Sequence, residues 1–257
     1  MKKYKFYALI IGTEILNGRR EDSHFKFLLE ALKEYGYTLS GSFIIEDNPD
    51  LIVKTVKFIA SLPDSILFSF GGIGSTPDDY TRMAAAKALR DGNLYTHKEA
   101  LKIIEKERGK KAYPYAIKMA ELPKDAKLLE NPVNKIPAFY LDDRFFFMPG
   151  FPQMSHPMVK FILKNILNLD KKRKKLYRYT LTALTREGNL IDVMEKLPKE
   201  VELSSLPKLY LDGFRVTISI ASEDEKLAKE AFEMFKNALE EKGIFYSLGE
   251  DISSTNQ

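Results

Sequence analysis

The feature that most restricts the fold of this chain is an alternation of apolar, strand-like runs with amphipathic helical stretches over residues 6–90. Strands are expected at 6–11, 38–45 and 65–70, and helices at 22–35, 49–61 and 79–90. Such alternation favours parallel strands joined by helical crossovers. The run at 65–70 is apolar throughout, which is typical of a central strand covered on both faces. The sequence therefore predicts an α/β domain with a mostly parallel sheet.

The pattern continues towards residue 168 with one interruption. Helices are expected at 97–108 and 153–167. Between them, residues 112–123 contain two prolines, and this segment is interpreted either as a lid or as a simple connection. Strands at 138–141 and 144–148 flank Asp142-Asp143, which predicts a hairpin turn.

The charged run at 170–175 is the strongest candidate for a domain boundary. We interpret it as a solvated linker rather than a nucleic-acid contact, because so short a basic run supplies few phosphate contacts. The segments beyond it are predicted to be strands at 176–184, 201–210, 214–221 and 244–248, and helices at 188–197 and 223–242. Their order is β-α-β-β-α-β, a split ferredoxin-like unit. The predicted domains are residues 1–170, which are α/β, and residues 176–257, which are α+β.

Composition excludes several classes of function. Lys and Arg total 40 against 36 Asp and Glu, and a net charge of +4 is too small to indicate nucleic acid or an acidic membrane as partner. The absence of cysteine excludes disulfides and thiolate chemistry. No apolar run approaches the roughly 20 residues that a membrane-spanning helix needs. A protein of the cytoplasm without a membrane partner is therefore expected.

The glycine-rich turn at 71–81 is the most informative segment, because it follows a buried strand and precedes a helix. Gly71, Gly72 and Gly74, followed by Ser75 and Thr76, would let backbone N–H groups cradle a phosphate. The turn lacks the lysine of the Walker motif and the spacing of a dinucleotide fingerprint. The alternative is a capped helix start, with Thr76 as N-cap, Pro77 at the first helical position and Asp79 closing a capping box.

Two further loops carry acidic residues at the ends of predicted strands. The first contains Gly12, Thr13 and Glu14. Glu14 is a candidate to bind either a divalent metal or a hydroxyl group of the bound molecule. Asp22 follows in the same loop, where it could equally cap the next helix. The second loop contains Asp47, although the neighbouring Asn48 is an adequate helix cap on its own.

Loops at the carboxyl ends of parallel strands meet at one edge of a sheet, where open α/β sheets bind ligands. The oxygen donors expected there are Glu14, Asp22, Asp47, Asp78 and Asp79. Hard oxygen ligands suit Mg²⁺ or Mn²⁺ shared with a phosphate, and the predicted metal ligands are Glu14, Asp78 and Asp79. The three histidines, His24, His97 and His156, show no metal-ligand spacing.

At these residues the chain resembles the CinA family, the competence- and damage-inducible proteins A, within the wider molybdopterin-binding fold. The resemblance covers roughly residues 1–168 and rests on six ordered segments: 12–18, 47–49, 71–81, 118–123, 131–133 and 148–154. The chain departs from the family pattern at Thr13, Ser75 and His24, where Asp, Pro and Asn are usual. The last domain looks like the KH-like middle domain of CinA proteins.

The resemblance implies a three-layer molybdopterin-binding-like domain and two alternative ligands. One is ADP-ribose or a related nucleotide, whose pyrophosphate would be hydrolysed with Mg²⁺, Mn²⁺ or Co²⁺. The other is a pterin, bound without hydrolysis. Asp47 and Asp79 correspond to functional acids of the wider fold, and Pro149 and Gly150 would line the same cleft.

The resemblance also implies a homo-oligomer. No nicotinamide-mononucleotide deamidase activity is expected, because the amidohydrolase domain of many CinA proteins would lie beyond Gln257. RNA binding through the last domain is the least favoured function, because that domain has no G-x-x-G loop.

Overall fold

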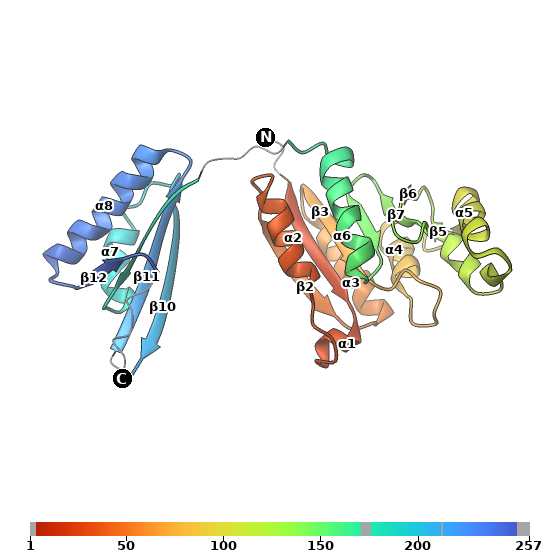
Figure 1. Cartoon of the computed structure of the whole chain (residues 1–257), viewed down its shortest axis with the longest axis horizontal. Helices are drawn as coiled ribbons and strands as arrows, with labels where there is room; N and C mark the ends of the chain where they lie inside the picture. Colours follow the sequence, from red (N-terminus) through yellow and green to blue (C-terminus); the bar gives the residue numbers. More distant parts are fainter. Residues whose placement is uncertain (1–3, 171–175, 212, 251–257) are drawn as a thin grey trace. The chain divides into compact units, whose positions relative to one another are not determined.

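The computed structural model describes residues 4–170, 176–211 and 213–250. Its contacts divide the chain into two compact units, Met1–Arg173 and Lys174–Gln257. Residues 171–175 of the predicted linker lie outside the described residues. Figure 1 labels the helices and strands of each unit.

The first unit is built around a six-stranded sheet in the order β2-β1-β3-β8-β7-β6. Its strands are β1 (Lys5–Ile11), β2 (Leu39–Ile45), β3 (Ser65–Phe70), β6 (Lys127–Leu129), β7 (Ala138–Leu141) and β8 (Phe145–Met148). Strands β2, β1, β3 and β8 are mutually parallel, whereas β7 and β6 add an antiparallel end. The predicted α/β class with a mostly parallel sheet is confirmed.

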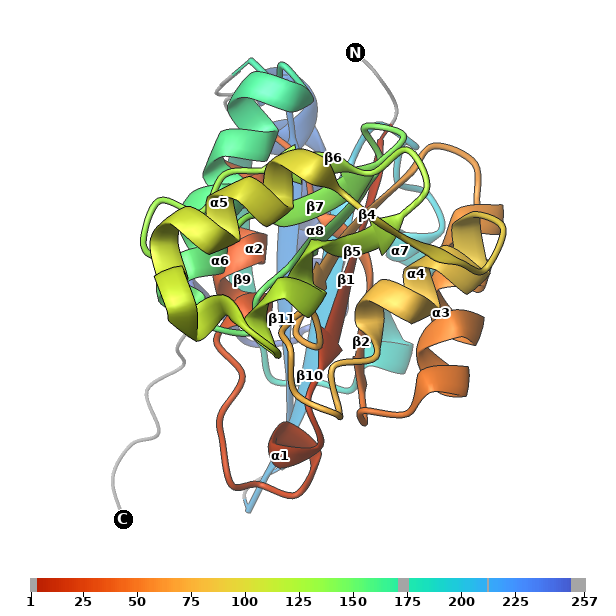
Figure 2. The same ribbon diagram turned by 90° about the vertical axis from the view of Figure 1, so that its right-hand side faces the viewer.

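Helices cover both faces of this sheet and make three layers. The α-helices of this unit are α1 (Thr13–Leu16), α2 (His24–Lys33), α3 (Pro49–Ser61), α4 (Thr81–Leu89), α5 (Lys98–Arg108) and α6 (Pro152–Phe161), which continues as the π-helix η3 (Ile162–Ile166). Figure 2 shows α2 and α6 on one side of the sheet and α3 and α4 on the other. Successive residues of β1 point to opposite faces of the sheet, and each face has its own hydrophobic core. Phe6, Ala8 and Ile10 pack with α2 and α6, whereas Tyr7, Leu9 and Ile11 pack with α3 and α4.

The proline-containing segment at 112–123, for which the sequence allowed either a lid or a simple connection, is a packed connection. It forms the 3-10 helices η1 (Gly109–Ala112) and η2 (Ala116–Ala120), followed by β5 (Glu121–Pro123), which pairs antiparallel with β4 (Leu94–Thr96). Ala112, Ala120 and Leu122 are buried in the core beneath α3 and α4. The predicted hairpin turn is present, since Asp142 and Asp143 join β7 to β8 with φ values of 57° and 51°.

The second unit is an antiparallel four-stranded sheet in the order β10-β11-β9-β12. Its elements are β9 (Tyr177–Ala183), the 3-10 helix η4 (Glu187–Leu190), α7 (Ile191–Met194), β10 (Glu202–Tyr210), β11 (Gly213–Ser222), α8 (Glu225–Glu241) and β12 (Tyr246–Leu248). This is the order of a split ferredoxin-like unit, so the predicted α+β class is confirmed. The helix expected at 188–197 is shorter and partly 3-10. No helix in the described parts of the chain is long and apolar enough to cross a membrane.

Candidate functional site at the carboxyl edge of the parallel strands

The parallel strands end at one edge of the sheet, and their following loops are tied together there. Gly12 donates its N–H to the carbonyl of Ile45 at 3.0 Å, which joins the loops after β1 and β2. Gly71 donates its N–H to the carbonyl of Met148 at 2.9 Å, which joins the loops after β3 and β8. The residues predicted to bind the ligand lie directly after β1, β3 and β8, Thr13 as the first residue of α1 and the others in loops: Gly12, Thr13, Gly71, Gly72, Gly74, Ser75, Thr76, Pro149 and Gly150.

Two of the glycines are required by close contacts between these loops. Gly71 has φ +103°, and a Cβ added there would lie 2.4 Å from the carbonyl oxygen of Ile11. A Cβ on Gly150 would lie 3.3 Å from the Cα of Gly71. Glycine is therefore explained at both positions by packing.

The glycine turn is a loop stabilised by its own side chains and is not the first turn of a helix. Thr76 donates its N–H to Oδ2 of Asp79 at 2.8 Å, and its Oγ1 lies 2.6 Å from the same oxygen and 2.5 Å from Oδ1 of Asp78. Helix α4 begins only at Thr81, whose Oγ1 donates to the carbonyl of Gly71 at 2.9 Å. The alternative of a helix capped by Thr76 is wrong, as is the predicted helix start at Asp79.

This arrangement leaves a pair of neighbouring carboxylates at the edge of the sheet. Asp78 is exposed, and the hydrogen bond from Thr76 holds the pKa of its carboxyl below its usual value. Asp79 is half-buried and uses Oδ2 to organise the turn. Both groups lie within hydrogen-bond distance of Thr76, and carboxylate oxygens are ligands that a hard cation prefers.

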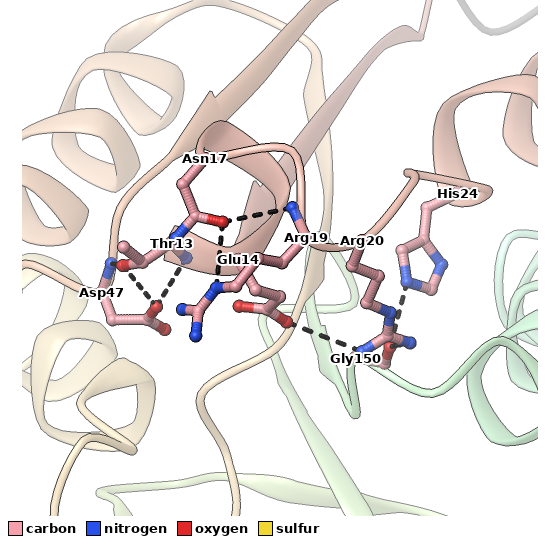
Figure 3. Close-up of polar contacts among 8 residues, drawn as sticks. All are labelled: Thr13, Glu14, Asn17, Arg19, Arg20, His24, Asp47 and Gly150. Carbon is pink, nitrogen blue, oxygen red and sulfur yellow. Dashed lines mark hydrogen bonds and ion pairs between the residues drawn. The ribbon is translucent and has the colours of Figure 1, made fainter.

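The first two loops meet through Thr13 and Asp47, which come from positions 34 residues apart (Figure 3). Oδ2 of Asp47 accepts from the N–H of Thr13 at 2.8 Å and from its hydroxyl at 2.9 Å. In return, the N–H of Asp47 donates to Oγ1 of Thr13 at 3.1 Å. Threonine at position 13 thus orients Asp47, whereas a second carboxylate there would repel it.

Other acids in these loops serve as helix caps or ion-pair partners. Asp22 accepts from the N–H groups of His24 and Phe25, both at 2.9 Å, so its role is that of a cap for α2. Asn48 likewise caps α3, leaving Asp47 free of that role. Glu14 lies 3.6 Å from the guanidinium of Arg20, a contact between half-exposed side chains (Figure 3).

The carboxylates do not form a ready-made metal centre. Within residues 4–170, 176–211 and 213–250 there is no group of three or more His, Asp or Glu side chains placed to hold a metal ion, so Glu14, Asp78 and Asp79 make no such triad. Magnesium is commonly bound by one or two carboxylates together with substrate phosphates. Asp78 and Asp79 fit that kind of site, in which the cation is shared with the ligand.

Arg82 is a site residue that sequence reasoning did not identify. Its side chain is buried, and Nη2 donates to the carbonyl of Gly74 at 2.8 Å. Nη1 donates to the carbonyls of Lys118 and Glu121. Arg82 therefore fastens the glycine turn to η2 and to the start of β5. Nothing local marks this role, because all three partners are main-chain oxygens, two of them more than 30 residues away.

A pair of histidines supports the same edge from inside the protein. His24 stacks on Phe70 and lies 3.3 Å through Nε2 from the carbonyl of Gly150. His156 lies edge-on to His24 and stacks on Phe27. Burial lowers the pKa of both imidazoles, that of His156 to about 4, so both rings are neutral near pH 7.

The histidine pair predicts that the first unit loses stability in mild acid. An unfolded chain has ordinary histidine pKa values near 6.5 and binds protons more readily than the folded one, so stability falls as the pH drops from about 6.5 towards 4. Denaturant unfolding at several pH values should show a smaller loss for His156→Phe, which keeps the stacking but cannot titrate. An identical pH dependence in the variant and the wild type would contradict this account.

The chain is similar to known proteins over most of its length. A family model described as a probable molybdopterin binding domain matches residues 7–168. A Pyrococcus furiosus protein is 28% identical over 257 residues, covering 94% of this chain and 98% of that relative. A CinA-like protein of Sulfurihydrogenibium is 31% identical over 183 residues, covering 68% of this chain and 45% of the relative. This chain therefore matches less than half of that CinA-like protein.

A solved structure supports the same relationship. It is that of the protein CinA with unknown function from Thermoplasma acidophilum, which is 29% identical with a TM-score of 0.57 and covers 63% of this chain and 98% of that one. Together, the family model, the CinA-like sequences and this structure show that the chain belongs to the molybdopterin-binding domain family and, within it, to the CinA proteins.

Proposed function

We propose that this protein binds a nucleotide that contains a pyrophosphate, ADP-ribose or a close analogue, and hydrolyses the pyrophosphate with a divalent cation. The observation that carries the proposal is the geometry of the glycine turn. Because α4 begins at Thr81, Asp78 and Asp79 are not used to cap a helix. They stand beside an open glycine-rich backbone at the edge where the parallel strands end, which is the usual ligand edge of this class of sheet.

Each residue of the site has a role in the proposed reaction. Asp78 and Asp79 would hold Mg²⁺, Mn²⁺ or Co²⁺, and the cation would offset negative charge that develops on the phosphate oxygens. Glu14 would join them only by leaving Arg20, a small cost for a half-exposed ion pair. Backbone N–H groups of Gly72 and Gly74 would donate to phosphate oxygens, whereas that of Gly71 already donates to the carbonyl of Met148.

Asp47 is the proposed acid on the opposite side of the ligand from the glycine turn. Thr13 holds it in one orientation through Oδ2, which leaves Oδ1 to accept a hydrogen bond from the ligand or from water. In the reaction, water attacks one phosphorus and the bridging P–O bond breaks. The attacking water supplies the oxygen of one new phosphate and a proton to the other, giving AMP and ribose 5-phosphate.

Binding of molybdopterin without hydrolysis is the second candidate function. It is favoured by the family match over residues 7–168, whose description names that ligand. The same anion-binding turn would then receive the terminal phosphate of the pterin. Affinity for a pterin phosphate combined with no turnover of ADP-ribose would select this function over the first.

Replacement of Asp79 by Asn tests the proposed role of the acidic pair. The amide oxygen can still accept from Thr76, so the fold is retained, but the negative charge is removed. We expect Asp79→Asn to lower kcat/KM for ADP-ribose at least about tenfold, which is roughly 1.4 kcal/mol of transition-state stabilisation, with an unchanged thermal midpoint.

Asp64→Asn is the matched control, because Asp64 precedes β3 and lies at the opposite end of that strand. It is exposed and has φ +59°, a conformation that Asn tolerates well. Its turnover and thermal midpoint should equal those of the wild type. Wild-type turnover in Asp79→Asn would refute the assignment.

A further inference from the structure

Phe151 is a large apolar side chain exposed beside the proposed ligand site. It follows Gly150, precedes the first turn of α6 and is 57% exposed. Its backbone is held firmly, because its carbonyl accepts from the N–H of Met154 and from the N–H and hydroxyl of Ser155. The aromatic ring therefore projects from a fixed turn at the carboxyl edge of β8.

Arg20 lies over this ring, with its guanidinium carbon 5.8 Å from the ring centre. The guanidinium is itself held by a hydrogen bond from Nη2 to the carbonyl of Gly150 at 3.0 Å, and Nη1 lies 3.6 Å from the half-exposed Glu14 (Figure 3). A cation over an aromatic face is a favourable pairing. The hydrogen bonds of Arg20 and of the Phe151 backbone hold the pair in place. Because more than half of Phe151 stays exposed with Arg20 in place, the ring can contact a group of a ligand.

The pair adjoins the glycine turn. The backbones of Gly150 and Gly71 are in direct contact, as the 3.3 Å approach of an added Cβ shows. A ligand whose phosphate lies against the glycine turn therefore has Phe151 within reach of its next chemical group. Isolated exposed apolar residues are ordinary, but one paired with an anchored arginine at a ligand edge has a specific use.

We infer that Phe151 and Arg20 form a stacking platform for a planar nitrogen heterocycle, a nucleobase or a pterin, carried by the phosphate-bearing ligand. Aromatic side chains stack on such rings through the π-face with little dependence on their substituents, and arginine adds a cation–π contribution. The inference rests on the proposed ligand site and specifies what that site recognises. It predicts that a phosphate ester that carries a planar heterocycle binds more tightly than one that lacks it.

Equilibrium binding to the full chain tests the platform, with AMP, a pterin monophosphate and ribose 5-phosphate as probes at one salt concentration. The wild type should bind AMP, the pterin monophosphate or both at least about tenfold more tightly than ribose 5-phosphate. Phe151→Ala should remove this preference while leaving the affinity for ribose 5-phosphate unchanged. Of AMP and the pterin monophosphate, the one whose affinity falls more in Phe151→Ala carries the heterocycle that the platform recognises.

Phe161→Ala is the matched control, because Phe161 is 50% exposed at the far end of α6. It should keep the preference for ligands with a ring. Equal affinities of Phe151→Ala and the wild type for both ring ligands would overturn the platform, as would a wild type that does not prefer them. Hydrolysis of ADP-ribose is measured on the same samples. Turnover of ADP-ribose without a preference for the heterocyclic ligands overturns the platform alone. The absence of both turnover and binding of the three probes overturns the proposed site as well.

Discussion

Gly71→Ala is expected to lower the free energy of unfolding of the first unit by at least about 3 kcal/mol. Two costs add at this position. An L-residue at φ +103° is strained by roughly 1–2 kcal/mol, and a methyl group 2.4 Å from the carbonyl oxygen of Ile11 forces the ends of β1 and β3 apart. Because the same backbone carries the glycine turn, binding of phosphate ligands should be lost with the stability.

Gly92→Ala separates these two costs. Gly92 has a similar φ of +85°, but its added Cβ would meet only Lys87, at an ordinary 3.8 Å. It should therefore show the conformational cost of about 1–2 kcal/mol and no more. Denaturant unfolding of both variants measures the difference, and equal destabilisation would mean that the contact between the strand ends does not constrain the site.

Arg82→Met is the second variant with a large expected effect, a loss of at least about 2 kcal/mol of stability in the first unit. The buried guanidinium donates to the carbonyls of Gly74, Lys118 and Glu121, and Met leaves all three without that donor. Hydrogen bonds to a charged donor are worth about 1.5–3 kcal/mol, and buried acceptors left unpaired are costly.

An exposed arginine in the same unit gives the comparison for this variant. Arg108 ends α5 and is exposed, so Arg108→Met should change stability by no more than about 0.5 kcal/mol. Thermal and denaturant unfolding report both effects. If Arg82→Met were as stable as Arg108→Met, the connection of the glycine turn to η2 and to the start of β5 would have no energetic role.

The regular part of the first unit was predictable because its local signals agree with its packing. The helix Pro49–Ser61 has the predicted bounds, since Asn48 caps it and Pro49 suits the first helical position. The strand Ser65–Phe70 is buried on both faces, as its unbroken apolar run predicted. Asp142-Asp143 was recognised as a turn because Asp tolerates positive φ.

The elements that were missed lack a local signal or carry a misleading one. Thr76 and Asp79 have capping-box spacing, but their side chains close a loop and the helix starts later, at Thr81. Strands β4, β5 and β6 have three residues each, too few to show a period.

The candidate site was only partly predictable, for a related reason. Sequence reasoning located the glycines and acids because each has a distinctive chemistry at the end of a strand. It did not identify Arg20 or Arg82, whose partners are main-chain carbonyls distant in sequence and visible only in the fold. Nor could it decide that Asp22 caps a helix while Asp47 is held by Thr13.

The proposal that this chain cleaves a nucleotide pyrophosphate is tested by the cleavage of ADP-ribose in H₂¹⁸O. With Mg²⁺, Mn²⁺ or Co²⁺ present, we predict equal amounts of AMP and ribose 5-phosphate, one ¹⁸O atom in one of the two products, and no reaction once the cation is chelated. Binding of ADP-ribose without formation of either product, with all three cations, would contradict the claim.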